Sequence, residues 1–192
     1  MKNESRLQTI LLLMLAVVVL LLVVVVIGLF IKMMQLQSAL TPMGSLQPET
    51  GADEGLAIGT QFPPLALPNV DGGTTALEDF AGRKILLVFS STTCPACAGM
   101  YPHLQVFSEN NPDVQVVMVS LGSLEDNRGL VDEWGFAFPI LPVSDWRDEA
   151  MQAYQVPGTP FAYGLDEQGV IVNEGFVNTM QQMEALIAAN GQ

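Results

Sequence analysis

A run of uncharged residues near the N-terminus constrains this chain more than any other feature. From Ile10 to Ile31 the sequence reads ILLLMLAVVVLLLVVVVIGLFI. A helix rises about 1.5 Å per residue, so the run would be about 33 Å long and could cross a bilayer core of about 30 Å. Signal peptides have a shorter apolar segment followed by a cleavage site, and Gln37-Ser38-Ala39 is a poor site. We therefore expect an uncleaved transmembrane helix over residues 10–32. A cleaved signal peptide and a buried core helix are the alternatives.

The basic residues around this run predict its orientation. Lys2 and Arg6 precede it, whereas only Lys32 follows it closely. Because positively charged flanks stay in the cytoplasm, residues 1–9 should form a cytoplasmic tail. The remainder should then lie outside, as a single-pass protein of the cell membrane with an extracytoplasmic domain on the periplasmic or outer face. Residues 33–58 are rich in Pro, Gly, Ser and Gln without an apolar period, which is typical of a flexible linker.

Beyond the linker, short apolar runs alternate with segments of helical spacing. The expected strands are 65–70, 74–77, 84–90, 114–121, 138–143, 161–165 and 170–172, and the expected helices are 95–109, 124–134, 145–155 and 179–189. The nearly continuous apolar run at 84–90 is typical of a central strand that is buried on both faces. The order of elements predicts an α/β domain over residues 59–192, with a mixed, mostly parallel central sheet flanked by helices.

The only two cysteines, Cys94 and Cys97, directly follow the predicted central strand. Pro95 suits the first position of a helix, so Cys94 should be the residue that caps it. The amides of Ala96 and Cys97, at the positive end of the helix, should then point at the Cys94 sulfur and lower its pKa. Cys97, one turn later, could attack a mixed disulfide formed on Cys94. The spacing predicts a redox-active pair, with Cys94 as the nucleophile and Cys97 as the resolving thiol.

Two simpler interpretations of the cysteines are an inert buried pair and half of a metal site. The only histidine, His103, has a helical spacing that keeps it from facing both sulfurs, so we expect no metal site. No nucleotide or flavin motif is present, and we expect no cofactor beyond a Cys94–Cys97 disulfide. With 20 acidic and 7 basic residues the net charge is −13, which excludes electrostatic binding of nucleic acid.

A second signal precedes the strand predicted at 161–165. Pro160 has no N–H to give to a sheet, so its place at the start of a strand is unusual. A cis Thr159–Pro160 bond would accommodate the proline, and an ordinary trans turn is the alternative.

Together these motifs resemble the membrane-anchored thioredoxin-like thiol–disulfide oxidoreductases, which include cytochrome-biogenesis reductases and methylamine-utilisation thioredoxin-like proteins. The resemblance covers residues 59–189 and rests on GTQFPPLALPNVDG, CPAC and VPGTPFAYGLDEQGVI. It implies a thioredoxin-like fold with an N-terminal hairpin extension, with Pro160 as the family's cis-proline. It also implies that the backbone of Thr159 binds the substrate. The partners would be cysteine-containing exported proteins and a membrane or extracytoplasmic redox partner.

Three positions depart from the family pattern. Thr93 replaces the usual tryptophan, Val88 replaces a buried acid, and the segment after the motif, Ala98-Gly99-Met100, lacks an acid that some members carry. The threonine before C-P-x-C favours the methylamine-utilisation branch. The direction of electron flow and the client protein stay open.

Two other functions are weighed against this one. A thioredoxin-fold peroxidase is disfavoured, because Leu87 and Ser91 replace the proline and threonine of the usual peroxidatic motif. The other is a non-enzymatic assembly factor or metallochaperone that uses the fold to bind a client.

Overall fold

The computed structural model of the chain describes residues 20, 22, 55–147 and 149–188. Two compact units are distinguished, Met1–Glu49 and Thr50–Gln192. In the first unit only Leu20 and Leu22 are described, and both are helical and exposed. Apart from these two leucines, the expected cytoplasmic tail and transmembrane helix lie outside the described residues, as does most of the linker. Within the described residues, no helix has the length and apolar character needed to span a membrane.

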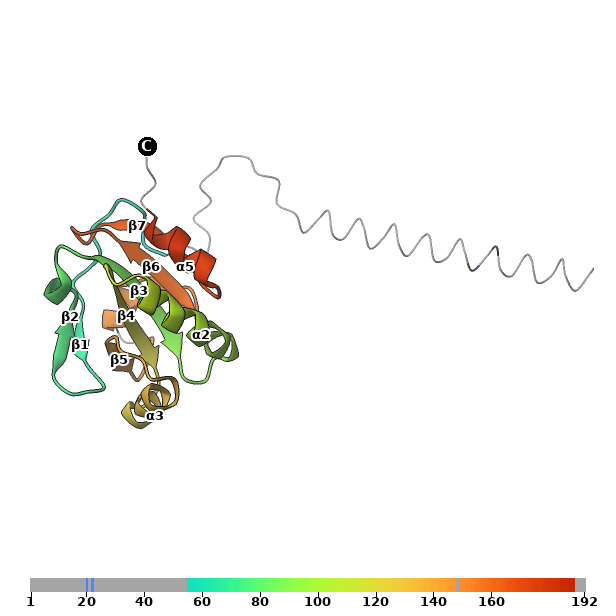
Figure 1. Cartoon of the computed structure of the whole chain (residues 1–192), viewed down its shortest axis with the longest axis horizontal. Helices are drawn as coiled ribbons and strands as arrows, with labels where there is room; N and C mark the ends of the chain where they lie inside the picture. Colours follow the sequence, from blue (N-terminus) through green and yellow to red (C-terminus); the bar gives the residue numbers. More distant parts are fainter. Residues whose placement is uncertain (1–19, 21, 23–54, 148, 189–192) are drawn as a thin grey trace, which may run out of the picture. The chain divides into compact units, whose positions relative to one another are not determined.

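A five-stranded sheet forms the centre of the second unit, in the order β5-β4-β3-β6-β7 (Figure 1). Its strands are β3 (Lys84–Ser91), β4 (Val114–Leu121), β5 (Ile140–Val143), β6 (Phe161–Leu165) and β7 (Ile171–Phe176). Strand β3 pairs in parallel with β4, and β4 with β5, whereas β6 runs antiparallel to both β3 and β7. The mixed α/β sheet is thus confirmed. All strands except β6 run in the same direction. Because β6 lies between β3 and β7, however, two of the four pairings are antiparallel.

A small hairpin precedes this sheet, where strands were expected at 65–70 and 74–77, and Asp71-Gly72-Gly73 lies at its turn. Strands β1 (Ala66–Pro68) and β2 (Thr74–Ala76) pair antiparallel and lead into the short 3-10 helix η1 (Leu77–Phe80). Gly72 and Gly73 have φ values of 96° and 78°, which residues with a side chain rarely adopt. The amide of Val70 donates to the carbonyl of Ile140 and so holds the hairpin against β5.

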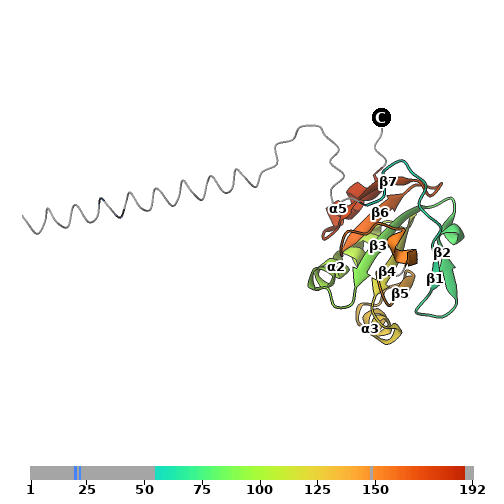
Figure 2. The ribbon, with the colours of Figure 1, turned by 180° about the vertical axis from the view of Figure 1, so that it is seen from behind.

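Three helices pack against one face of the sheet: α2 (Pro95–Asn110), α3 (Leu124–Trp134) and α5 (Met180–Ile187). The alternation of side chains along β3 explains the two faces. Leu86 and Val88 point into the core beneath these helices, and Leu87 and Phe89 point into the second core. The second core, on the opposite face of the sheet, is covered by residues 56–65, by η1 and by the segment that contains α4 (Glu149–Gln152). Figure 2 shows this side of the domain from behind.

The core beneath α2, α3 and α5 also contains a buried pair of hydroxyl groups. The hydroxyls of Ser90 and Tyr101 lie 2.9 Å apart, and both side chains are almost fully buried. Burial raises the pKa of Tyr101 and the hydrogen bond with Ser90 lowers it, with burial the larger effect. This pair lies on the helix-covered face of β3.

The predicted helix over residues 145–155 is wrong. Among the described residues of this segment, the helix α4 is restricted to Glu149–Gln152. The side chain of Asp145 accepts a hydrogen bond from the amide of Arg147 and so closes a local turn ahead of α4. Gln155 then has a positive φ of 47°, which ends any helical path. The segment is therefore mainly a loop.

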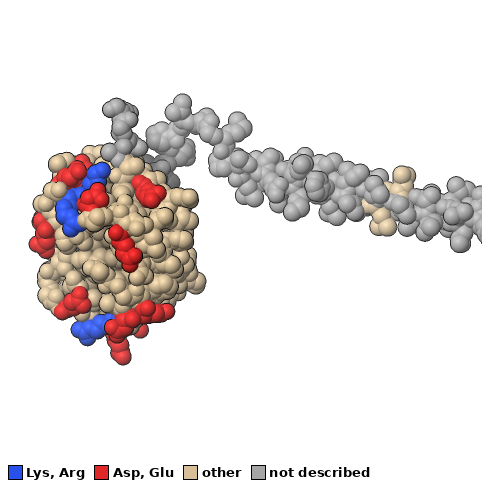
Figure 3. Space-filling model, in the orientation of Figure 1, with Lys and Arg blue, Asp and Glu red and all other residues tan. Residues whose placement is uncertain are grey.

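Acidic side chains are spread among uncharged residues on the face of the domain seen in Figure 3, and basic side chains are few. The pattern agrees with the net charge of −13.

Candidate active site

The two cysteines lie where β3 ends and α2 begins. Cys94 is the N-cap of α2 and Pro95 is its first residue, as expected. The amide of Cys97 donates to the Cys94 sulfur at 3.2 Å. The amide of Cys94 in turn donates to the carbonyl of Ser91 at 3.1 Å, which holds the cap to the end of the strand. One of the two predicted amide contacts with the sulfur, that of Cys97, is therefore present.

Cys94 and Cys97 form a disulfide, with their Cα atoms 5.2 Å apart. The two residues differ in access to solvent. Cys94 is half-buried, whereas Cys97 is fully buried in the core beneath α2. Pro95 and Ala96 are exposed beside them. A partner can therefore reach Cys94 but not Cys97, and this asymmetry suits a nucleophile and a resolving thiol.

The loop before β6 meets the disulfide from the other side. The Thr159–Pro160 peptide bond is cis, as predicted. The carbonyl oxygen of Thr159 lies 3.6 Å from the Cys94 sulfur. Pro160 is buried, and its carbonyl accepts a hydrogen bond from the amide of Val177, just beyond β7. All six residues that the sequence singled out for the site thus lie at this one end of the sheet.

A cavity of about 640 Å³ opens beside Cys94. None of the thirteen residues that line it is charged: Ser91, Thr93, Cys94, Pro95, Leu121, Trp146, Met151, Gln152, Gln155, Val156, Pro157, Gly158 and Thr159. Four of these residues were not expected near the cysteines, because their spacing predicts a helix: Trp146, Met151, Gln152 and Gln155. The Pro157-Gly158 pair beside the predicted site was the one local signal that this segment turns towards the cysteines.

Two of the positions that depart from the family pattern, Val88 and Thr93, lie near the disulfide. Val88 is fully buried in the same core as Cys97. An apolar side chain therefore fills the position where related proteins place an acid. Thr93 is exposed and lines the cavity.

His103 lies on α2, within the helix that the sequence predicts at residues 95–109. His103 is exposed on α2. Across the described part of the chain, no group of three or more His, Cys, Asp or Glu side chains could hold a metal ion.

Comparisons with known proteins place this site among redox proteins. Residues 58–179 match the AhpC/TSA family. The methylamine utilization protein MauD of Paracoccus denitrificans is 30% identical over 166 residues, which cover 85% of this chain and 79% of that protein. The thiol-disulfide oxidoreductase ResA of Geobacillus thermodenitrificans is 26% identical over 119 residues, which cover 60% of this chain and 67% of that protein.

A solved structure supports the fold. The thioredoxin domain of a thiol-disulfide oxidoreductase from Bacteroides vulgatus superposes with a TM-score of 0.61 at 21% identity, and covers 69% of this chain and 99% of that domain. The likeness identifies the fold as thioredoxin-like.

Proposed function

The chain belongs to the AhpC/TSA family and is a thiol–disulfide oxidoreductase, and from this premise we propose that it exchanges disulfides with cysteine-containing exported proteins while tethered to a membrane. The observation that carries the proposal is the asymmetry of the cysteine pair. The accessible Cys94 caps α2 and faces an open cavity, whereas the buried Cys97 lies behind it. A client disulfide can reach only the first sulfur.

The exchange proceeds in two steps in the reduced protein. The Cys94 thiolate attacks one sulfur of the client disulfide, a mixed disulfide forms, and the other client sulfur leaves as a thiolate that takes a proton from water. Cys97 then loses its proton to water and attacks the Cys94 sulfur. The Cys94–Cys97 disulfide forms and the client leaves as a dithiol, having gained two electrons. The reverse sequence oxidises a client dithiol.

The N-terminus of α2 supplies the electrostatic support for the first step. The amide of Cys97 donates to the Cys94 sulfur, and such a hydrogen bond favours a thiolate over a thiol. The fully buried Val88 offers no carboxylate to take the proton from Cys97. We therefore assign deprotonation of Cys97 to water that enters once the mixed disulfide has formed on Cys94.

The client would bind along the loop that carries Thr159. Its carbonyl faces the reactive sulfur, and an extended peptide could pair with the backbone there. Because the cavity beside Cys94 has no charged lining residue, the client segment next to its cysteine should be uncharged. The same lining disfavours a peroxidase, because none of these residues offers a cation to hold a peroxide.

We also propose where the protein is located and which group carries the electrons. The apolar run at residues 10–32 would anchor the protein, with its domain on the extracytoplasmic side. The Cys94–Cys97 pair would carry the electrons without a further cofactor.

A thiol-trapping experiment tests the proposed exchange. The full chain carrying Cys97→Ser, once reduced, should accumulate a mixed disulfide with a disulfide-bonded client peptide, because the resolving thiol is gone. A non-reducing gel measures the adduct. The Cys94→Ser variant is the control and should form at least about 100-fold less adduct, since its remaining thiol is buried. Equal trapping by both variants would contradict the assigned roles.

A further inference from the structure

The first described stretch of the domain lies along the β6–β7 side of the sheet. We call residues 55–64 the strap. The amide of Gly59 donates to the carbonyl of Ile171, and the amide of Ile171 donates back to the carbonyl of Thr60, at 2.8 and 2.9 Å. The amide of Phe62 donates to the carbonyl of Gly169 at 3.0 Å. The strap is therefore fastened to the sheet by backbone hydrogen bonds, at the place where the N-terminal linker meets the domain.

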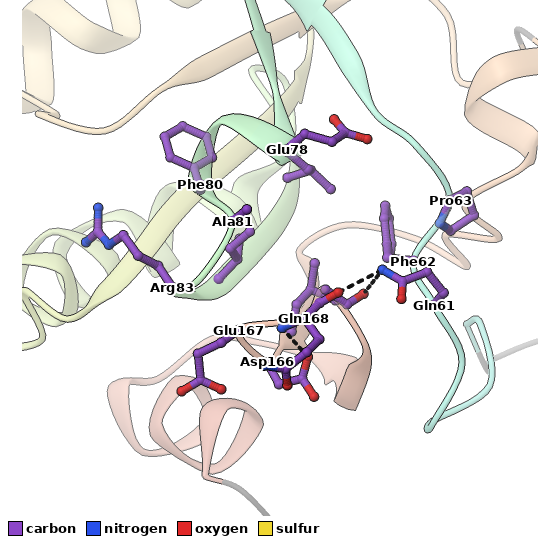
Figure 4. A pocket seen from close by; sticks show the side chains of 14 residues that line it. Gln61, Phe62, Pro63, Glu78, Phe80, Ala81, Arg83, Asp166, Glu167 and Gln168 are labelled. Atoms are coloured by element: carbon purple, nitrogen blue, oxygen red, sulfur yellow. Dashed lines mark hydrogen bonds between the residues drawn. The ribbon is translucent and has the colours of Figure 1, made fainter.

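Figure 4 shows a second fastening, at a small cavity of about 150 Å³. The side-chain amide of Gln61 donates to the carbonyls of Gln168 and Gly169, at 3.0 and 3.2 Å. The cavity also includes Arg83 and Ile85, so it lies at the opposite end of β3 from Cys94. These contacts hold Gln61, in the middle of the strap, at the end of the sheet opposite the disulfide.

One phenol joins the strap to the active-site loop. The hydroxyl of Tyr163, on β6, accepts a hydrogen bond from the amide of Leu56 at 2.9 Å. The same hydroxyl donates to the carbonyl of Tyr154 at 2.7 Å. Tyr163 is fully buried, so neither contact is easily replaced by water. The amide of Gly55 adds a bond of 2.9 Å to the carboxylate of Glu174 on β7.

A second phenol completes the connection in the other direction. The hydroxyl of Tyr154 donates to the carbonyl of Pro64, at the end of the strap, at 3.0 Å. The ring of Phe62 stacks on that of Tyr154 at 5.4 Å and meets the edge of Tyr163 at 5.2 Å. The strap and the two tyrosines thus form one buried aromatic cluster.

Tyr154 lies in the loop between α4 and β6. The next five residues, from Gln155 to Thr159, all line the cavity beside Cys94. Gln155 has a φ of 47°, a conformation that a residue with a side chain adopts only when its surroundings hold it. The Thr159 carbonyl thus lies between two anchored points, Tyr154 at one end of the loop and Pro160, whose carbonyl accepts from Val177, at the other.

We propose that Tyr163 and Tyr154 are positioning residues that fasten the active-site loop to the strap, so that affinity for the client depends on the strap. The inference rests on the proposed exchange with client disulfides. The two tyrosines do not touch the reacting sulfurs; they act through the backbone of the loop that ends at Thr159.

The test compares Tyr163→Phe and Tyr154→Phe in the full chain, with a disulfide-bonded client peptide as the probe. Tyr163→Phe removes both bonds of its hydroxyl, whereas Tyr154→Phe removes only the bond to Pro64 and keeps the carbonyl that Tyr163 contacts. Tyr154→Phe should raise the KM for the client by about 3- to 10-fold, the effect of one lost buried hydrogen bond, and Tyr163→Phe, which loses two, should raise it by at least as much. The kcat should change less than about twofold, since the chemical step is untouched.

Two measurements separate positioning from a general loss of structure. The rate at which a small alkylating reagent modifies Cys94 in the reduced protein should stay within about twofold of the parent, because α2 is unchanged. Val114→Ala is the control: it removes buried apolar atoms from the core on the other face of the sheet, at the end of β4 far from Cys94. This variant should lose comparable stability but keep the parent KM.

The outcomes are distinguishable. If the parent protein does not exchange with the peptide, the proposed function fails. If the parent is active and both variants keep its KM, the positioning role is wrong. If only Tyr163→Phe raises KM, the bond from Tyr154 to Pro64 does not hold the loop, and the positioning role of the Tyr154 hydroxyl is wrong.

Discussion

The sulfur of Cys94 lies 3.6 Å from the carbonyl oxygen of Thr159, although 65 positions separate the two residues in the chain. In the reduced protein this carbonyl can accept a hydrogen bond from the Cys94 thiol, and a client strand can offer it an N–H instead. The contact therefore links the state of the nucleophile to the place where a client would bind.

Cys94 should titrate below the usual cysteine pKa of about 8.5, since it caps α2 and accepts the Cys97 amide. The rate of alkylation against pH in the reduced protein measures this pKa. Cys97 should react at least about 10-fold more slowly because it is buried. The Cys97→Ser and Cys94→Ser variants report each thiol separately. Equal rates and equal pKa values for the two would disprove the asymmetry.

Residues beyond Lys32 should lie on the extracytoplasmic side, because the basic residues cluster before the apolar run. A membrane-impermeant thiol reagent added to intact cells should label Cys94 in the reduced protein. The control is a cysteine introduced at Ser5, which should be labelled only after permeabilisation. The opposite pattern would reverse the topology.

Gly164 should be needed for the packing of α5 on the sheet. A Cβ at this position in β6 would collide with the backbone carbonyl of Leu186 in α5. Because that obstacle is backbone, Gly164→Ala should lower the free energy of unfolding by about 2 to 3 kcal/mol, measured by urea denaturation. Gly129→Ala is the matched control, since Gly129 is exposed on α3 with no atom within 4 Å of an added Cβ. It should be neutral or stabilise by up to about 1 kcal/mol. Equal effects would show that α5 adjusts freely.

Alkaline pH should destabilise the domain through its buried tyrosines. Burial raises the pKa of Tyr163 to about 12 from the ordinary value of 10. Tyrosine is neutral when protonated, so between pH 10 and 12 the unfolded chain loses its proton first and is favoured. The stabilisation is complete below pH 10 and falls as the pH rises through 12, by at most about 2 to 3 kcal/mol.

Urea unfolding of the oxidised protein from pH 9 to 11.5 measures this loss, with the cysteines held as a disulfide so that they do not titrate. Tyr163→Phe should make the decline with pH shallower. An unchanged slope would show that Tyr163 ionises normally.

Local features of the sequence determined most of the elements. The helix at 124–134 and the strands at 114–121 and 161–165 have the predicted bounds, because caps, turns and apolar periods act over a few residues. Cys94 could be placed at the N-cap of α2 for the same reason, from the strand before it and the proline after it. The cis bond before Pro160 could be predicted because a proline at the start of a strand has few solutions.

Only the tertiary structure decided what surrounds the disulfide. The cavity lined by Trp146 and Gln155 was not predicted. Residues 145–155 have helical spacing, but in the structure most of them form turns and pack against Phe62 and the second core. The bonds of the Tyr163 hydroxyl to Leu56 and Tyr154 join segments 107 and 9 residues away. No local pattern encodes such contacts. They depend on which strands pair and which faces they bury, and these are properties of the whole sheet.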